Sequence, residues 1–311
     1  MAEVAVERAH DLAARRAARS RRRARAIGFV ERSVIYLILT AGSLIFLFPL
    51  AWMISTSLKT LRQTFPDVGT PILEQAIPDP LVLTSYVDII TSPAWHNYFL
   101  NSAVLTVGCM AGVTISASLT AYSFSRLQWP GRNALFVLVL ATMMLPYQVT
   151  LIPQFVIFSG KAPMPFPVVT NTFWPFWLPA FLGGNAFSIF LLRQFMMTLP
   201  GELDEAAVID GAGPGTVFWR LIVPQIFPAL AAIAIFAFQF NWNALLGPVI
   251  YLNRTENFTV IQGLLQYRTQ TEVEWNQLMA ASVLVMLPPI LLFFFAQRYF
   301  IEGISLTGLK G

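Results

Sequence analysis

The sequence predicts an all-α protein that crosses a membrane about six times, and three observations support this prediction. Hydrophobic residues make up 56% of the 311-residue chain and charged residues only 12%, whereas soluble domains carry about 25% charged residues. The mean hydropathy is +0.63. The apolar residues gather in stretches of about 20, the length with which a helix crosses the hydrocarbon core of a bilayer. So few charges could not cover the surface of a water-soluble chain.

Six such stretches follow one another along the chain. They run over residues 34–53, 102–124, 134–158, 173–192, 226–251 and 278–296. The fourth is the weakest, because Pro175, Pro179, Gly183 and Gly184 interrupt it. Helix breakers are tolerated in membrane helices whose neighbours satisfy the freed backbone groups. If the chain had only five spans, the asymmetric distribution of lysine and arginine over the connecting segments would also be lost.

The placement of lysine and arginine predicts that both ends of the chain face the cytoplasm. Fifteen basic residues fall on the side of the N-terminus and five on the opposite side, and cytoplasmic segments carry the excess of positive charge. The predicted organisation is an Arg-rich cytoplasmic arm over 1–33, a six-helix membrane domain over 34–298 and a cytoplasmic tail over 299–311. The arm contains a single Phe, Tyr or Trp residue, Phe29 beside the first span, and so has no series of aromatic rings for stacking on bases. We therefore expect it to contact anionic membrane lipid and no nucleic acid.

The longest polar stretch on the cytoplasmic side after the arm is the loop 199–224, between the fourth and fifth spans. Glu202, Asp204 and Glu205 predict the first turn of a short helix there, because carboxylates favour the positive end of the helix dipole. Gly211 predicts its end, since glycine readily adopts the left-handed conformation that follows many helices.

A second short helix is predicted in the same loop. Gly213-Pro214-Gly215 predicts a turn, after which Thr216 caps a helix that ends before Pro224. The two helices would form an elbow whose apolar face needs a partner to cover it. That face comprises Leu203, Ala206, Ala207 and Val208.

This loop resembles the EAA loop of the permeases of ABC importers. Glu205-Ala206-Ala207, three residues, Gly211, nine residues and then Leu221-x-Val223-Pro224 follow the spacing of that loop, with Leu and Val where the family has Ile and Leu. Motifs resembling those of the MalG-like carbohydrate permeases occur in order over about residues 34–311. They include Ala121-Tyr-Ser-Phe-Ser-Arg126, Leu145-Pro146, Trp242-Asn243 and Gln297-Arg-Tyr-Phe300.

The resemblance implies a type I ABC importer permease in the bacterial inner membrane, with a coupling helix that docks on an ATPase subunit. The implied coupling residues are Glu205, Ala206, Ala207, Asp210, Gly211 and Pro224. The implied partners are a second, homologous permease, an extracytoplasmic solute-binding protein and two ABC ATPase subunits, which bind the ATP and Mg. The implied function is ATP-driven import of a sugar, oligosaccharide or polyol. The alternatives are import of a non-sugar solute and, from another class, secondary transport.

Polar residues in the fourth and fifth spans are candidates for the solute pathway. Buried amides in hydrocarbon are costly unless paired, and amides bond sugar hydroxyls while an indole face stacks on a sugar ring. The alternative is that these groups join neighbouring helices. The main candidates are Asn241, Trp242 and Asn243; the weaker ones are Gln239, Asn185 and Ser188.

Catalytic groups are sparse in this sequence. Its two histidines, His10 and His96, cannot form a His-rich metal site and make a His-based triad implausible. No Gly-x-x-x-x-Gly-Lys-Ser/Thr loop occurs, so we expect this chain to bind no ATP or other cofactor itself. No acidic or basic residue lies at the centre of a span, so a proton relay has no visible carrier. The sequence therefore favours a transport subunit over an enzyme.

Overall fold

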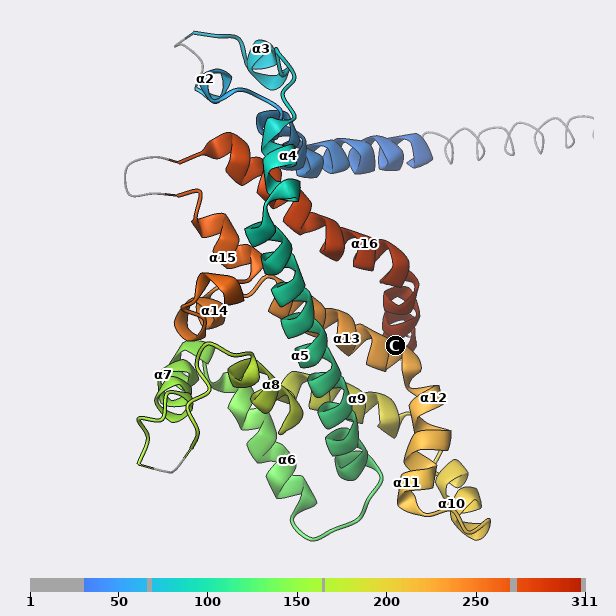
Figure 1. The fold of residues 1–311 in the computed structure, drawn as a ribbon. Helices are drawn as coiled ribbons and strands as arrows, with labels where there is room; N and C mark the ends of the chain where they lie inside the picture. The colour runs from blue at the N-terminus through green and yellow to red at the C-terminus, as the bar shows by residue number, and fades with distance from the viewer. Residues whose placement is uncertain (1–30, 66–68, 164–165, 269–272, 309–311) are drawn as a thin grey trace, which may run out of the picture.

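The computed structural model describes residues 31–65, 69–163, 166–268 and 273–308, which are almost entirely helical (Figure 1). The first described helix, Glu31–Ser57, carries no label in the figure and is drawn in blue. It is followed by three short helices, α2 (Leu61–Thr64), α3 (Ile72–Ala76) and α4 (Thr84–Thr91), and then by the long α5 (Pro93–Ser125). Most of the predicted arm, residues 1–30, and the last three residues of the predicted tail lie outside the described residues.

The later part of the chain is broken into shorter helices. They are α6 (Arg132–Ala141), η1 (Thr142–Met144), α7 (Tyr147–Phe158), α8 (Trp174–Phe181), α9 (Ala186–Met197), α10 (Glu202–Ile209), α11 (Pro214–Thr216), η2 (Val217–Ile222), α12 (Val223–Gln225), α13 (Phe227–Trp242), α14 (Leu246–Tyr251), η3 (Thr255–Asn257) and α15 (Val260–Leu265). The last helix, α16 (Trp275–Gly308), runs ten residues into the predicted 299–311 tail, over residues 299 to 308.

Four described segments are long and apolar enough to cross a membrane, and two bent helix pairs raise the number to six. The four are Glu31–Ser57, Pro93–Ser125, Trp174–Met197 and Trp275–Gln297. The bent pairs are Arg132–Met144 with Tyr147–Phe158, and Pro214–Gln225 with Phe227–Trp242. All six predicted stretches are therefore helical, including the doubtful fourth one, which combines α8 and α9 around a short break.

The third and fifth predicted spans are not straight helices, which corrects the sequence analysis. The third bends by 100°, because Pro146 forces the preceding Leu145 into an extended conformation. The fifth was predicted over 226–251, but α13 ends at Trp242 and α14 is a separate helix. Asn243 is the residue that ends α13, and its side-chain N–H donates to the carbonyl of Gln239 at 2.8 Å.

Helix α5 is the central element of the fold, and α4, α8, α9, α13 and α15 all pack against it (Figure 1). Its 33 residues correspond to about 50 Å of length. Close packing against α8 depends on glycine: a Cβ added at Gly108 would lie 2.3 Å from Nε1 of Trp177. Two hydrogen bonds hold the same crossing, from Trp177 Nε1 to the carbonyl of Leu105 at 3.2 Å and from Ser116 Oγ to the carbonyl of Ala180 at 2.7 Å.

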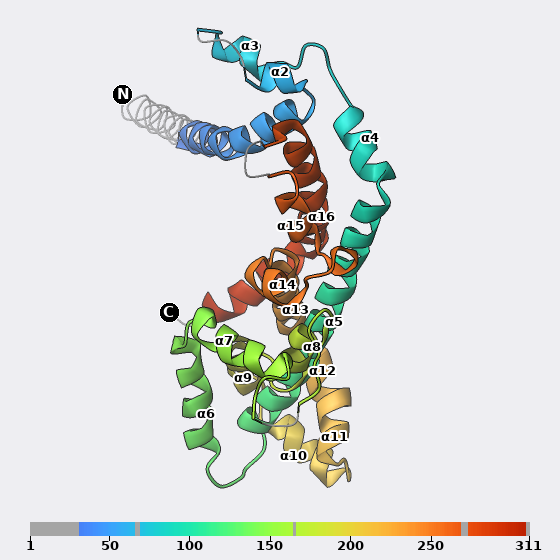
Figure 2. The same ribbon diagram turned by 60° about the vertical axis from the view of Figure 1, so that its left-hand side comes forward.

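The two ends of α5 belong to different parts of the molecule. Figure 2 shows α2 and α3 beyond one end and α10 with α11 at the other. Near the first end lies the segment that joins α14 to α16; we call its residues 252–267 the distal connection. Asn171, with φ of 59°, holds the start of this connection, since its Oδ1 accepts the N–H groups of Asn253 and Arg254 at 2.6 and 3.1 Å.

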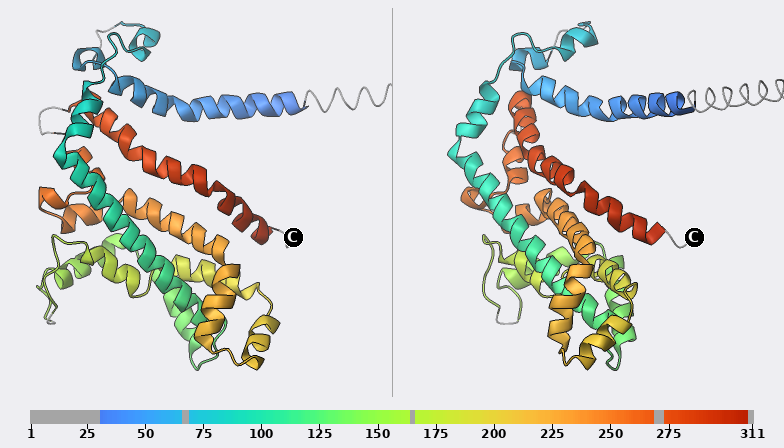
Figure 3. Two further views of the ribbon diagram at one scale, coloured as in Figure 1. Left: turned by 45° about the vertical axis from the view of Figure 1, so that its right-hand side comes forward. Right: turned by 90° about the vertical axis from the view of Figure 1, so that its right-hand side faces the viewer.

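The first described helix stands apart from the rest of the chain in both views of Figure 3. None of its most apolar window is buried, whereas 44% of the corresponding window of α5 is buried. Large apolar side chains such as Leu37, Ile45 and Phe46 are 70%, 71% and 85% exposed. A covering for this helix must come from lipid or from another protein.

Candidate coupling site

The first helix of the predicted elbow is α10, and it begins and ends as its sequence predicts. Glu202, Asp204 and Glu205 occupy its first turn. At its end Gly211 has φ of +81°, and the N–H groups of Gly211 and Ala212 donate to the carbonyls of Val208 and Ala207 at 3.0 and 2.9 Å. This pair of bonds is a Schellman motif, in which the left-handed residue satisfies the last carbonyls of a helix.

The second helix is longer than predicted, and two details of the prediction are wrong. It runs without interruption over Pro214–Gln225 and starts at Pro214, so Thr216 lies inside it and does not cap it. Proline suits a first helical position because that position needs no N–H donor. Pro224 lies within the helix as well; the wider π-helical turns of η2 precede it and α12 restarts around it. We call α10 together with Pro214–Gln225 the coupling elbow.

The apolar face of α10 is largely uncovered. Leu203, Val208 and Ile209 are 37%, 63% and 85% exposed, and Glu205 and Ala206 are exposed as well. Ala207 differs from the prediction, because it is half-buried and packs against the core cluster under the elbow. Several exposed aliphatic side chains on a short helix are typical of a surface that a partner covers.

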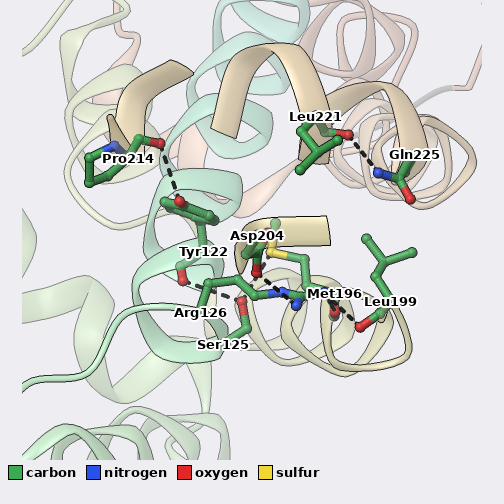
Figure 4. Close-up of polar contacts among 9 residues, drawn as sticks. All are labelled: Tyr122, Ser125, Arg126, Met196, Leu199, Asp204, Pro214, Leu221 and Gln225. Atoms are coloured by element: carbon green, nitrogen blue, oxygen red, sulfur yellow. Dashed lines mark hydrogen bonds and ion pairs between the residues drawn. The ribbon is translucent and has the colours of Figure 1, made fainter. Parts of the chain in front are cut away.

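The C-terminal end of α5 holds both arms of the elbow (Figure 4). Arg126 Nη1 donates to Asp204 Oδ2 of α10 at 2.9 Å, while its Nη2 donates to the carbonyls of Met196 and Leu199 at 2.6 and 2.9 Å. One turn earlier, the Tyr122 hydroxyl donates to the carbonyl of Pro214 at 3.2 Å, where the second arm begins. One face of α5 therefore fixes both elbow helices and the end of α9.

The ion pair between Arg126 and Asp204 is sheltered and incomplete. The two side chains are only 10% and 24% exposed. Arg126 Nε and Asp204 Oδ1 are buried without a hydrogen-bond partner among the described residues. The pair thus rests on a single hydrogen bond, although arginine and a carboxylate can form two parallel ones. Sequence reasoning missed this pair; the signals it offered were a lone arginine directly after a span and an acidic residue in the first turn of α10.

The predicted pathway residues divide into exposed and buried ones. Asn185 and Asn243 are exposed, and Gln239 and Asn241 are partly exposed. Asn185 also caps α9, since its Oδ1 accepts the N–H of Ser188 at 2.7 Å. Asn241 donates to the carbonyl of Ala237 in its own helix at 2.7 Å.

Trp242 and Ser188 are corrections to the predicted pathway, because they are only 4% and 2% exposed. The Trp242 indole N–H donates to the carbonyl of Val285 in α16 at 3.0 Å, and its ring stacks on Phe238 with centroids 5.4 Å apart. The indole N–H is therefore bonded to the neighbouring helix and is not available to a solute. Trp242 joins α13 to α16.

Bent and broken membrane helices that carry an exposed helical elbow at one end are compatible with a membrane transport permease. The sequence profile of the family described as "Binding-protein-dependent transport system inner membrane component" matches residues 112–305, and the chain belongs to this family. Members are transporter permeases and not enzymes, and the EAA motif that forms the elbow here is a feature of the family.

Individual relatives agree with this assignment. The chain is 34% identical to the osmoprotective compounds uptake permease protein GgtD of Synechocystis sp., over 73% of this chain and 75% of that one. It is 31% identical to the arabinooligosaccharides transport system permease protein AraQ of Halalkalibacterium halodurans, over 85% and 91%. A chain of a bacterial ABC transporter that imports the acidic polysaccharide alginate has a similar fold, with a TM-score of 0.72 at 19% identity over 86% of this chain and 95% of that one.

Proposed function

We propose that this chain is one permease subunit of an ATP-driven importer of a sugar, oligosaccharide or polyol, and that the coupling elbow docks on an ATPase subunit. The uncovered apolar face of α10, held by a Schellman end and by bonds to α5, is the observation that carries the proposal. Glu205, Ala206, Asp210 and Gly211 would present or shape that face, and Pro224 would lie in the last turn of the second arm. ATP and Mg would be bound by the ATPase subunits.

Two further features support the proposed partners and solute. The uncovered first helix and the exposed amides of Asn185 and Asn243 leave surfaces for a second, homologous permease and for a pathway between the two. The family name makes transport dependent on a binding protein, and relatives are named for arabinooligosaccharides and osmoprotective compounds. Because one relative is named for osmoprotective compounds, import of a non-sugar solute is the alternative proposal.

The proposed orientation places the elbow and both chain ends in the cytoplasm. It can be tested with single cysteines at Ile209 in the elbow and at Glu256 in the distal connection, because the native Cys109 is buried. A membrane-impermeant maleimide added to intact cells should label the second site and spare the first. The reverse pattern would overturn the orientation.

The docking proposal can be tested with a charge placed on α10. We expect Ile209→Glu to abolish co-purification of the ATPase and ATP-driven solute uptake in proteoliposomes, because it puts a carboxylate into an apolar contact. Asn133→Glu, an exposed position on α6 outside the elbow, is the matched control and should retain both. Uptake that persists in Ile209→Glu without ATP would favour a secondary transporter instead.

A further inference from the structure

We propose that α5 is the strut through which the coupling elbow and the distal connection act on each other, with Arg126 and Tyr122 as positioning residues at one end and Trp95 and Asn101 at the other. This inference rests on the proposed function, in which the elbow receives the movement of an ATPase. It assigns that movement to a helix that is remote in sequence, although the elbow directly connects α9 and α13.

At the elbow end, α5 makes bonds that the flanking helices do not. Tyr122 and Arg126 stand four residues apart and therefore on one face of α5. They reach one arm each, through the carbonyl of Pro214 and the carboxylate of Asp204. Arg126 also holds the carbonyls of Met196 and Leu199, so the end of α9 moves with the same side chain. A displacement of either arm must therefore move α5 or break one of these bonds.

The ion pair between Arg126 and Asp204 attaches α10 to α5 through a single hydrogen bond, which allows α10 to rotate. Two parallel bonds between arginine and a carboxylate fix their orientation as well as their distance. A single bond fixes the distance alone, and here Arg126 Nε and Asp204 Oδ1 are left without partners among the described residues. Helix α10 can thus turn about the pair while it stays attached to α5.

At its other end, α5 is bonded to the distal connection. Trp95 Nε1 donates to the Tyr267 hydroxyl at 2.8 Å, and the two rings stack with centroids 5.9 Å apart and planes 12° apart. Asn101 Nδ2 donates to the carbonyls of Glu256 and Phe258 at 2.7 and 3.0 Å. Ser102 Oγ accepts the N–H of Val260 at 2.8 Å. These bonds join α5 to both η3 and α15.

Between these ends, α5 is built to transmit a displacement. Its 33 residues form one unbroken helix whose only proline is in the first turn. Among the other described spans, two bend by 100° and 80°, α16 contains Pro288 and Pro289, and the first helix has none of its most apolar window buried. A rigid, well-packed element with hydrogen bonds at both ends is one physical route by which two remote sites are coupled, and by linkage the effect must run in both directions.

Hydrogen exchange tests the strut without any transport assay. The complex isolated from membranes is compared with three variants: Arg126→Lys, which keeps the charge but loses the planar fork; Trp95→Phe, which loses only the indole N–H and part of the ring; and Arg132→Lys as the control. Arg132 also donates to a backbone carbonyl, that of Leu127, at 2.8 Å. We expect Trp95→Phe to speed exchange in the elbow at least tenfold, and Arg126→Lys to do the same in the distal connection. Changes confined to the altered end would overturn the inference.

Transport stoichiometry provides a second readout, with Tyr122→Phe as a milder variant should Arg126→Lys not assemble. We expect Arg126→Lys and Trp95→Phe each to lower the solute moved per ATP hydrolysed at least tenfold in proteoliposomes. The double variant should be no worse than the poorer single one, because one break already releases the strut. Effects that multiply would show two independent local roles and refute the inference. If the wild-type complex shows no ATP-driven uptake, the proposed function fails, while the exchange experiment still decides whether the two ends are coupled.

Discussion

Replacing Gly211 with aspartate should uncouple the elbow while leaving the protein in the membrane. The residue has φ of +81°, and no heavy atom lies within 4 Å of an added Cβ, so the effect is conformational and not a clash. A side chain in the left-handed region costs about 1–2 kcal/mol, and aspartate lies near the lower value because its short polar side chain can hydrogen-bond locally. A carboxylate at the negative end of the α10 dipole adds about 0.3–1 kcal/mol. The sum, about 1.3–2 kcal/mol, lowers the population of the formed helix end by a factor of about 10–30.

The assay is ATP-driven uptake into proteoliposomes that contain equal amounts of inserted protein. Gly211→Asp should reduce uptake at least tenfold. Gly211→Asn should retain more activity, because it adopts the left-handed region as aspartate does but places no charge at the negative end of the α10 dipole. The matched control is Gly213→Asp, which adds the same carboxylate where φ is −75° and space is open. Wild-type uptake by Gly211→Asp, or an equal loss in Gly213→Asp, would refute the conformational argument.

Three further predictions concern packing and the distal connection. Gly108→Ala should lower the Tm of the purified protein, because overpacking against Trp177 costs about 1–3 kcal/mol, whereas Gly42→Ala in the uncovered first helix should leave the Tm unchanged. Asn171→Ala should destabilise the distal connection by about 2–4 kcal/mol, since it removes two accepted hydrogen bonds and keeps a left-handed φ; unchanged protease resistance there would contradict this. Trp242→Phe should lower the Tm yet keep the KM for solute within about twofold, whereas a large KM change would restore Trp242 to the pathway.

The features that sequence reasoning predicted are those that short-range physics determines. The six apolar stretches follow from the thickness of the bilayer, and the extent of α10 follows from the carboxylates of its first turn and from Gly211. The bend before Pro146 had its signal in the sequence, because proline restricts the residue that precedes it. The long apolar run over 134–158 outweighed that signal in the prediction.

The features that were missed depend on contacts between distant segments. Arg126 and Asp204 are 78 positions apart, and no periodicity relates the two. Trp242 and Ser188 carry polar groups that suit a pathway, yet burial decides whether a solute can reach them, and burial is set by how α13, α16 and α9 pack. Chemical type therefore selected plausible candidates, and packing separated the exposed amides from the buried ones.

The uncovered first helix has a consequence for how cells produce this protein. The most apolar part of this 27-residue helix is not covered by its own chain, so the subunit depends on lipid or on a partner to cover that surface. A copy synthesised in excess of its partners would keep that surface open to the proteases that survey the membrane, whereas an assembled copy would hide it. We therefore expect the scarcest subunit to set the amount of transporter, and surplus copies of this chain to have short lifetimes.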